Sequence, residues 1–181
     1  MEERNNLPGN KVNIATQKML GGIGAILMVV IFIPLIPIAG SVVLIVSLYQ
    51  ISRMVKKPSI FNKFIIGFVL GIIGDILLFF FGLLSLGSSM MGGRINFWIT
   101  LVPAYILSIV GFYFCKQAFD MLAKTINHKL FSTAGIIMFI SAITTIILFL
   151  GWILGGILLF AGWIILAVAF FTAPEEVEVV G

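Results

Sequence analysis

The longest run without a charged residue extends from Leu130 to Pro174 and reads LFSTAGIIMFISAITTIILFLGWILGGILLFAGWIILAVAFFTAP. As a single helix it would be about 67 Å long, whereas the hydrocarbon core of a bilayer is about 30 Å thick. The run must therefore fold back on itself, and Gly151 is the natural corner. It predicts two membrane-spanning helices at 130–149 and 152–173, with Pro174 ending the second.

A second uncharged run, Met19–Ser52, would be about 51 Å long as one helix. Pro34 and Pro37 interrupt its middle, and prolines at this spacing mark a break. The run therefore predicts two helices at 15–34 and 38–55, joined by a tight apolar turn.

Two further helices are predicted between these runs. One lies at 60–87, where the apolar sequence is interrupted only by Asp75 and opens after Pro58-Ser59, a helix N-cap signal. The other lies at 96–124 and contains the uncharged segment Ile95–Cys115. The predicted fold is thus an all-α membrane protein with six transmembrane helices.

The composition agrees with a lipid environment. The chain is 61% hydrophobic and 10% charged, whereas soluble domains carry roughly 25% charged residues. Six spans leave one domain at 15–173, a polar N-terminal tail at 1–14 and an acidic C-terminal tail at 174–181, which we expect to be disordered. There is no room for a separate soluble domain.

Basic residues test the number of spans, because cytoplasmic loops carry an excess of Lys and Arg. Four spans would divide the eleven basic residues four against seven. Six spans with both termini in the cytoplasm leave only Arg94 outside. The other ten are then cytoplasmic: Arg4, Lys11, Lys18, Arg53, Lys56, Lys57, Lys63, Lys116, Lys124 and Lys129.

The odd-numbered helices begin alike, with a lysine followed by a glycine in Lys18–Gly21, Lys63–Gly67 and Lys129–Gly135. This pattern fits three repeated helical hairpins. It also fits any helix that enters the bilayer from the cytoplasm, because the lysine-to-glycine spacing drifts. Both interpretations stay open.

Asp75 is the main candidate for a functional residue, because an ionised carboxylate at mid-membrane costs roughly 2.5–3.5 kcal/mol and such residues often mark ion or proton paths. The alternative is a protonated structural Asp75 that donates one hydrogen bond to a neighbouring helix. Ser141, Thr144 and Thr145 form a mildly polar patch that fits a partner for Asp75 or the lining of a narrow path. The competing expectation is that these hydroxyls bond to their own helix.

Glycines at helix-packing spacing form a second feature. Gly67, Gly71 and Gly74 lie on one predicted helix, and Gly151 and Gly155 on another. Without side chains, helix backbones approach closely. The two interpretations are packing within the chain and contact with a second copy.

The basic cluster Arg53, Lys56, Lys57 and Lys63 lies between two predicted helices. Near the inner leaflet each cation is worth about 1 kcal/mol of attraction to anionic lipid headgroups. The same charges also serve simply to orient the protein. The net charge of +4 therefore indicates membrane orientation and lipid contact, and we expect no nucleic-acid partner.

No catalytic constellation is present in the sequence. His128 is the only histidine and lies in a predicted loop, so no metal site is assembled, and Cys115 has no second thiol to pair with. Asp75 and Asp120 are predicted at different depths, too far apart to share a proton. We therefore expect no enzyme activity, metal or cofactor.

Four segments resemble a family of prokaryotic membrane proteins catalogued as domain of unknown function 996. They are LGGIGAIL at 20–27, PSIFN at 58–62, LFSTAG at 130–135 and ILAVAFF at 165–171. The resemblance spans nearly the whole chain after its polar start. It implies a multi-span protein of a prokaryotic plasma membrane, without an activity or functional residues, and Asp75 is not part of its pattern.

These observations favour a structural or interaction role, as a homo-oligomer or as the partner of another membrane protein, because the spans carry few of the polar groups that permeation or chemistry requires. The alternative is a small transporter or channel for protons, cations or solutes that uses Asp75. An intramembrane enzyme comes third.

Overall fold

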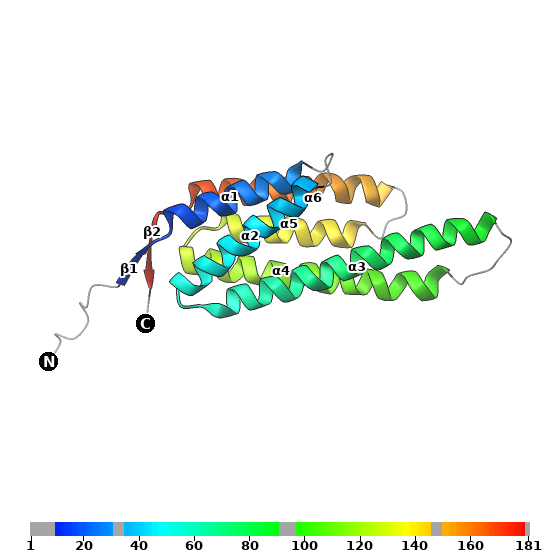
Figure 1. The fold of residues 1–181 in the computed structure, drawn as a ribbon, viewed down its shortest axis with the longest axis horizontal. Helices are drawn as coiled ribbons and strands as arrows, with labels where there is room; N and C mark the ends of the chain where they lie inside the picture. The colour runs from blue at the N-terminus through cyan, green and yellow to red at the C-terminus, as the bar shows by residue number, and fades with distance from the viewer. Residues whose placement is uncertain (1–9, 31–34, 91–96, 146–149, 180–181) are drawn as a thin grey trace.

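The computed structural model describes residues 10–30, 35–90, 97–145 and 150–179, with side chains described for 11–30, 35–80, 102–145, 151 and 153–178. Six helices run alternately in opposite directions between the two ends of one elongated bundle (Figure 1). They are α1 (Ala15–Val29), α2 (Leu35–Met54), α3 (Pro58–Met90), α4 (Phe97–Ile126), α5 (Leu130–Thr144) and α6 (Leu150–Thr172).

Four helical segments are long and apolar enough to cross a membrane. They are Leu35–Met54, Pro58–Phe80, Val102–Ile126 and Ile153–Thr172. The other two helices, α1 and α5, are apolar but have 15 residues each. They end at Val29 and Thr144, short of the predicted ends at 34 and 149, while residues 31–34 and 146–149 lie outside the described part.

The other helix bounds differ from the predictions by a few residues at each end. The largest differences are that α2 begins at Leu35 instead of near 38, and that α3 ends at Met90 instead of near 87. Pro37 thus lies in the first turn of α2. Proline is tolerated there because the first N–H groups of a helix have no acceptor within it.

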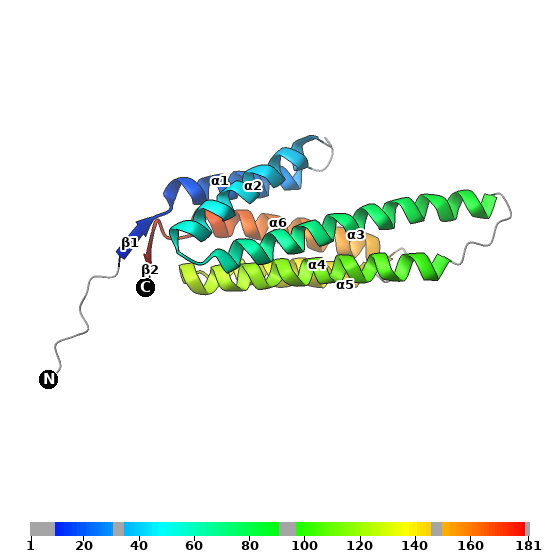
Figure 2. The ribbon, with the colours of Figure 1, turned by 60° about the horizontal axis from the view of Figure 1, so that its bottom comes forward.

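The helices pack as three hairpins, and the hairpin α5–α6 lies between the other two. Within the bundle α4 packs on α5 and α1 packs on α6, whereas α2 and α3 diverge from the turn that joins them (Figure 2). The largest fully buried side chains are Phe64, Phe119, Phe131 and Phe170, and Phe131 meets Phe170 edge to face with ring centroids 4.9 Å apart. These rings hold α3, α4, α5 and α6 together near the end that carries both termini.

The expectation of a disordered C-terminal tail is wrong. Strand β1 (Asn10–Asn13) pairs antiparallel with strand β2 (Glu176–Val179), with Lys11 opposite Glu178. Glutamates and valines alternate in β2, so that Val177 is buried and the glutamates are exposed. The two ends of the helical bundle are therefore tied to each other.

Lys18 fastens this ribbon to the helices. Its ammonium donates a 2.8 Å hydrogen bond to the carbonyl oxygen of Ala173 and lies 3.4 Å from the Glu175 carboxylate. A cation at the end of α6 also meets the negative pole of that helix. The backbone N–H of Ile14 donates to the Glu175 carbonyl at 2.8 Å, so the contact continues through the main chain.

Helices α2 and α4 end in the same backbone conformation. Lys56 and Asn127 have φ angles of 55° and 56°, in the left-handed region. One residue later, the N–H groups of Lys57 and His128 donate to the carbonyls of Ser52 and Ala123, at 2.9 Å each. This six-to-one bond is the Schellman cap, in which glycine or asparagine usually takes the left-handed position.

We therefore expect Lys56→Gly to stabilise the fold by about 1 kcal/mol, because the left-handed conformation strains a lysine and not a glycine, while the freer unfolded chain offsets part of the gain. Unfolding in a neutral detergent measures this change. Lys57→Gly is the matched control and should lose stability, because only Lys56 and Asn127 have positive φ among the described non-glycine residues. Equal effects of the two substitutions would contradict the assignment.

Candidate functional site

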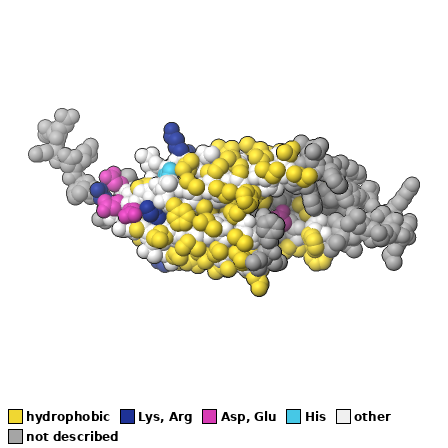
Figure 3. Space-filling model, turned by 90° about the horizontal axis from the view of Figure 1, so that it is seen from above, with side chains coloured by type: hydrophobic (Ala, Val, Ile, Leu, Met, Phe, Trp, Pro, Cys, Tyr) yellow, Lys and Arg dark blue, Asp and Glu magenta, His cyan; other side chains and the backbone are white. Residues whose placement is uncertain are grey.

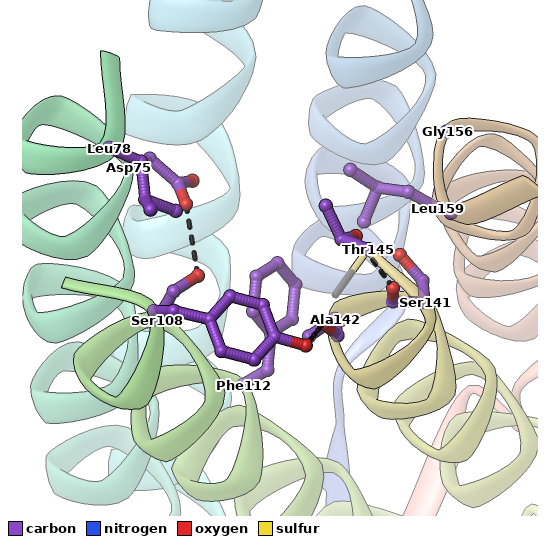
Figure 4. A pocket seen from close by; sticks show the side chains of 11 residues that line it. Asp75, Leu78, Ser108, Phe112, Ser141, Ala142, Thr145, Gly156 and Leu159 are labelled. Carbon is purple, nitrogen blue, oxygen red and sulfur yellow. Dashed lines mark hydrogen bonds between the residues drawn. The ribbon is translucent and has the colours of Figure 1, made fainter. Parts of the chain in front are cut away.

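A pocket of about 230 Å³ lies between α3, α4, α5 and α6 (Figure 4). Its volume has room for several water molecules or one small solute. Polar groups reach it from α3, α4 and α5, and apolar side chains fill the rest of its wall. The lining residues are Asp75, Leu78, Tyr105, Ser108, Phe112, Ser141, Ala142, Thr145, Gly155, Gly156 and Leu159.

Asp75 accepts a hydrogen bond from the neighbouring helix at the edge of this pocket. The buried hydroxyl of Ser108 donates to Asp75 Oδ1 at 3.0 Å. Gly74 makes this approach possible, since a Cβ added at Gly74 would lie 2.6 Å from the Ser108 nitrogen. The sequence placed Asp75 correctly on α3 but did not identify Ser108 as its partner.

On the α5 side of the pocket, Tyr105 of α4 forms hydrogen-bond contacts with the backbone of α5. Its hydroxyl lies 2.6 Å from the Ala142 carbonyl oxygen and 2.8 Å from that of Ile143, so its one proton is directed to the last turn of α5. Tyr105 therefore links α4 to α5 beside the pocket.

The polar patch predicted on α5 is divided between the pocket and the helix backbone. Ser141 and Thr145 line the pocket, but the hydroxyls of Thr144 and Thr145 donate to carbonyls of their own helix at 2.8 and 2.9 Å. The partner of Asp75 is Ser108, not this patch. The structure therefore agrees with the expectation that the hydroxyls of Thr144 and Thr145 bond to their own helix.

The Asp75 carboxyl has no cationic partner in the described part of the chain. The ion pairs there join Lys11, Lys18 and Lys116 to other carboxylates. Lys63, the nearest lysine before Asp75 on α3, is twelve residues away, about 18 Å along the helix. Asp75 is exposed in the isolated chain.

The predicted packing glycines lie at contacts within the chain. A Cβ added at Gly67 would lie 2.6 Å from the Gly111 carbonyl oxygen of α4, and one added at Gly155 would lie 2.7 Å from Thr145 Oγ1 of α5. Gly151 is buried. Gly71 differs, since an added Cβ meets nothing within 4 Å, although its backbone lies against Gly111.

The sequence did not single out Tyr105 and Ser108, which bring polar groups to the pocket, or Gly111, which packs against α3. A signal for two of them exists, because Ala104, Ser108, Gly111 and Cys115 place small residues at spacings of four, three and four along one face of α4. This stripe faces the glycines of α3. The predicted cluster of Arg53, Lys56, Lys57 and Lys63 lies outside the pocket, around the turn between α2 and α3.

Comparison with known proteins identifies the family of the chain but assigns no activity to it. Residues 36–169 match the family described as "Protein of unknown function (DUF996)", which confirms the resemblance seen in the sequence. The chain is also 28% identical over 180 residues to "Uncharacterized protein MJ1644" of Methanocaldococcus jannaschii, covering 93% of this chain and 97% of that protein. No solved structure matches the chain.

Proposed function

The chain belongs to the family described as "Protein of unknown function (DUF996)". From this premise, we propose that it is an integral membrane protein of six crossings that carries a proton or a small cation through Asp75. The family description assigns no activity, so the fold and the pocket supply the support. The observation that carries the proposal is the Asp75 carboxyl, hydrogen-bonded to Ser108 beside a pocket that reaches four helices.

Two features support six crossings. Four helical segments have the length and hydropathy of membrane spans, and α1 and α5 run antiparallel to α2 and α6 within the same bundle. The pairing of β1 with β2 brings both ends of the helical domain together, which favours an even number of crossings. Six satisfies this condition with every helix of the bundle counted.

The orientation follows from the basic residues. The described lysines and the one described arginine belong to the helix ends and turns on the side of the β ribbon. On the face that it presents, Figure 3 shows most of the charged side chains at that end and mainly apolar side chains beyond them. The positive-inside rule assigns this end to the cytoplasm of a prokaryotic cell.

A counter-charge would stabilise the carboxyl at this depth. An ionised aspartate near the centre of a bilayer costs roughly 2.5–3.5 kcal/mol, and one hydroxyl donor offsets about 1.5–3 kcal/mol, which leaves up to about 2 kcal/mol uncompensated. A proton or a bound cation removes the charge. The pocket offers the carboxylate oxygens and the hydroxyls of Ser108 and Ser141 to such an occupant. Oxygen groups of this kind bind protons and hard cations.

Flux through reconstituted vesicles tests this function. Wild-type protein should dissipate an imposed proton or cation gradient, and Asp75→Asn should reduce the rate at least tenfold, because the amide keeps the shape but takes no proton and holds no charge. Asp120→Asn is the matched control: Asp120 lies at the cytoplasmic end, bonded to Lys116 at 2.6 Å, and its loss should leave flux within about twofold. Equal rates in wild type and Asp75→Asn would exclude the proposal.

A structural or interaction role is the second candidate, and one observation favours it. The Asp75–Ser108 bond ties α3 to α4 directly. This role predicts no flux from wild type, together with a lower melting temperature for both Asp75→Asn and Ser108→Ala. Flux and melting measured on the same preparations therefore separate the two functions.

A further inference from the structure

Apart from Lys129, which directly precedes α5, the described cations at the ribbon end fall into two groups. Three of the described lysines lie within 3.4 Å of a carboxylate oxygen: Lys11 with Glu176, Lys18 with Glu175, and Lys116 with Asp120. These pairs belong to the β ribbon, to the residue that precedes β2, and to α1 and α4. The positive charge of each of these lysines is therefore neutralised by the neighbouring carboxylate.

A second group of cations is held by neutral partners. The Arg53 guanidinium donates to the Tyr49 hydroxyl at 3.1 Å and lies 5.7 Å from the centre of its ring. The Lys57 ammonium donates to Thr125 Oγ1 at 3.3 Å, and the Lys63 ammonium donates to Gln117 Oε1. Neutral acceptors position these side chains but leave their charge uncompensated.

Two more cations add to this group. Lys56 lies next to Lys57 in the turn between α2 and α3, and Lys124 lies next to Thr125 on α4. Both are exposed, and neither has a carboxylate partner within the described ranges. The headgroup cluster, as we name it, therefore comprises Arg53, Lys56, Lys57, Lys63 and Lys124.

The surface directly below this cluster is apolar and exposed. Ile66 lies one turn after Lys63 on α3 and is 46% exposed, and Tyr113 lies one turn before Gln117 on α4 and is also 46% exposed. Cations above an apolar surface match a phospholipid, whose phosphate meets the cations while its acyl chains cover the side chains beneath. A free phosphate would use only the upper half of this surface.

We propose that the headgroup cluster binds the phosphate of an anionic lipid in the leaflet at the ribbon end. Beneath the lipid, Lys57 bridges the α2–α3 turn to α4, and Lys63 bridges α3 to α4. The bound lipid would brace the hairpin α3–α4 against α2 at the point where α2 and α3 diverge (Figure 2). Each cation near a membrane surface contributes to such binding. The site lies apart from the Asp75 pocket and does not depend on transport.

Native mass spectrometry of the full chain in a neutral detergent tests the site. Phosphatidylglycerol should bind at least tenfold more tightly than phosphatidylcholine with the same acyl chains. The double variant Lys56→Gln/Lys57→Gln should lose at least tenfold in phosphatidylglycerol affinity. The control Lys11→Gln/Lys129→Gln removes the same charge at the same end and should change affinity by less than twofold.

Three outcomes overturn the proposal. Equal losses in both double variants would mean that only total charge matters. Displacement of phosphatidylglycerol by millimolar inorganic phosphate would mean that the site takes a free anion instead of a lipid. Unchanged affinity in Lys56→Gln/Lys57→Gln would place the lipid elsewhere. The variant Lys56→Arg/Lys57→Arg keeps both charges and should bind as wild type does, which separates loss of charge from loss of folding.

Discussion

Gly111→Ala should lower the free energy of unfolding by about 3 kcal/mol, because overpacking a tight helix contact costs roughly 1–3 kcal/mol and the atoms in the way are backbone. The added methyl carbon would lie 2.5 Å from the Gly71 nitrogen and 2.7 Å from the Gly67 carbonyl oxygen. Neither atom can move without displacing α3 as a whole. Unfolding in mixed micelles, followed by circular dichroism, measures the loss.

Gly71→Ala is the matched control for this substitution, since it adds the same methyl group at the same level of the same contact. Its methyl would meet nothing within 4 Å, and alanine favours the helix over glycine by about 1 kcal/mol. We therefore expect unchanged or slightly higher stability. Similar losses from both substitutions would show that the packing of α3 on α4 differs from the one described.

Single cysteines at opposite ends of the bundle should react in an all-or-none way with a membrane-impermeant thiol reagent in intact cells. In a Cys115→Ala background, Arg94→Cys should be labelled almost completely, because six crossings place it outside. Lys57→Cys and Glu178→Cys should stay unlabelled, because they belong to the cytoplasmic end of the proposed topology. Mass shift on a gel after quenching measures the labelled fraction.

Permeabilised cells provide the control for this labelling, since all three cysteines should then react. Labelling of Glu178→Cys together with Arg94→Cys in intact cells would contradict three crossings between these two positions, and therefore the six-crossing topology. Labelling of Glu178→Cys and Lys57→Cys without Arg94→Cys would keep six crossings and reverse the orientation. The experiment therefore tests the number of crossings separately from the orientation of the protein in the membrane.

The six helices could be predicted because two physical quantities fix them, the length of an uncharged run and the thickness of a bilayer. Leu130–Pro174 is too long for one crossing, and the structure does contain two helices in that run. The ends of α1 and α5 could not be placed as well, since uninterrupted apolar residues carry no stop signal. The start of α2 was missed because Pro37 acts as a breaker only inside a helix, not in its first turn.

Of the hydrogen-bonded pair in the site, the sequence predicted Asp75 but not its partner Ser108. Asp75 is conspicuous because a carboxyl interrupts an apolar run, whereas Ser108 is one serine among many in membrane helices. Only the packing of Gly74 on the α4 backbone brings Ser108 within hydrogen-bond distance. The pocket also collects Tyr105 and Ser141 from separate helices, and sequence spacing within one helix says nothing about such neighbours.

The ribbon was missed although its pattern was present. Glu176-Val177-Glu178-Val179 alternates charged and apolar residues, as a half-buried strand does, but the acidic composition suggested a solvated tail. Its partner, Asn10–Asn13, lies at the other end of the chain, so no local signal connects the two. The pairing of Lys11 with Glu176 does follow from opposite charges once the strands are adjacent.

The contact of α1 with α6 has a consequence for how the protein is made. Lys18 bonds a carbonyl 155 positions later in the chain, and β1 has no partner strand until β2 is synthesised. Both partners follow all six helices in the chain, so in the proposed membrane topology the first hairpin lacks these contacts until the sixth helix and β2 have been synthesised. A nascent chain stalled before Ala173 should thus leave its amino-terminal segment open to proteases that the finished protein resists.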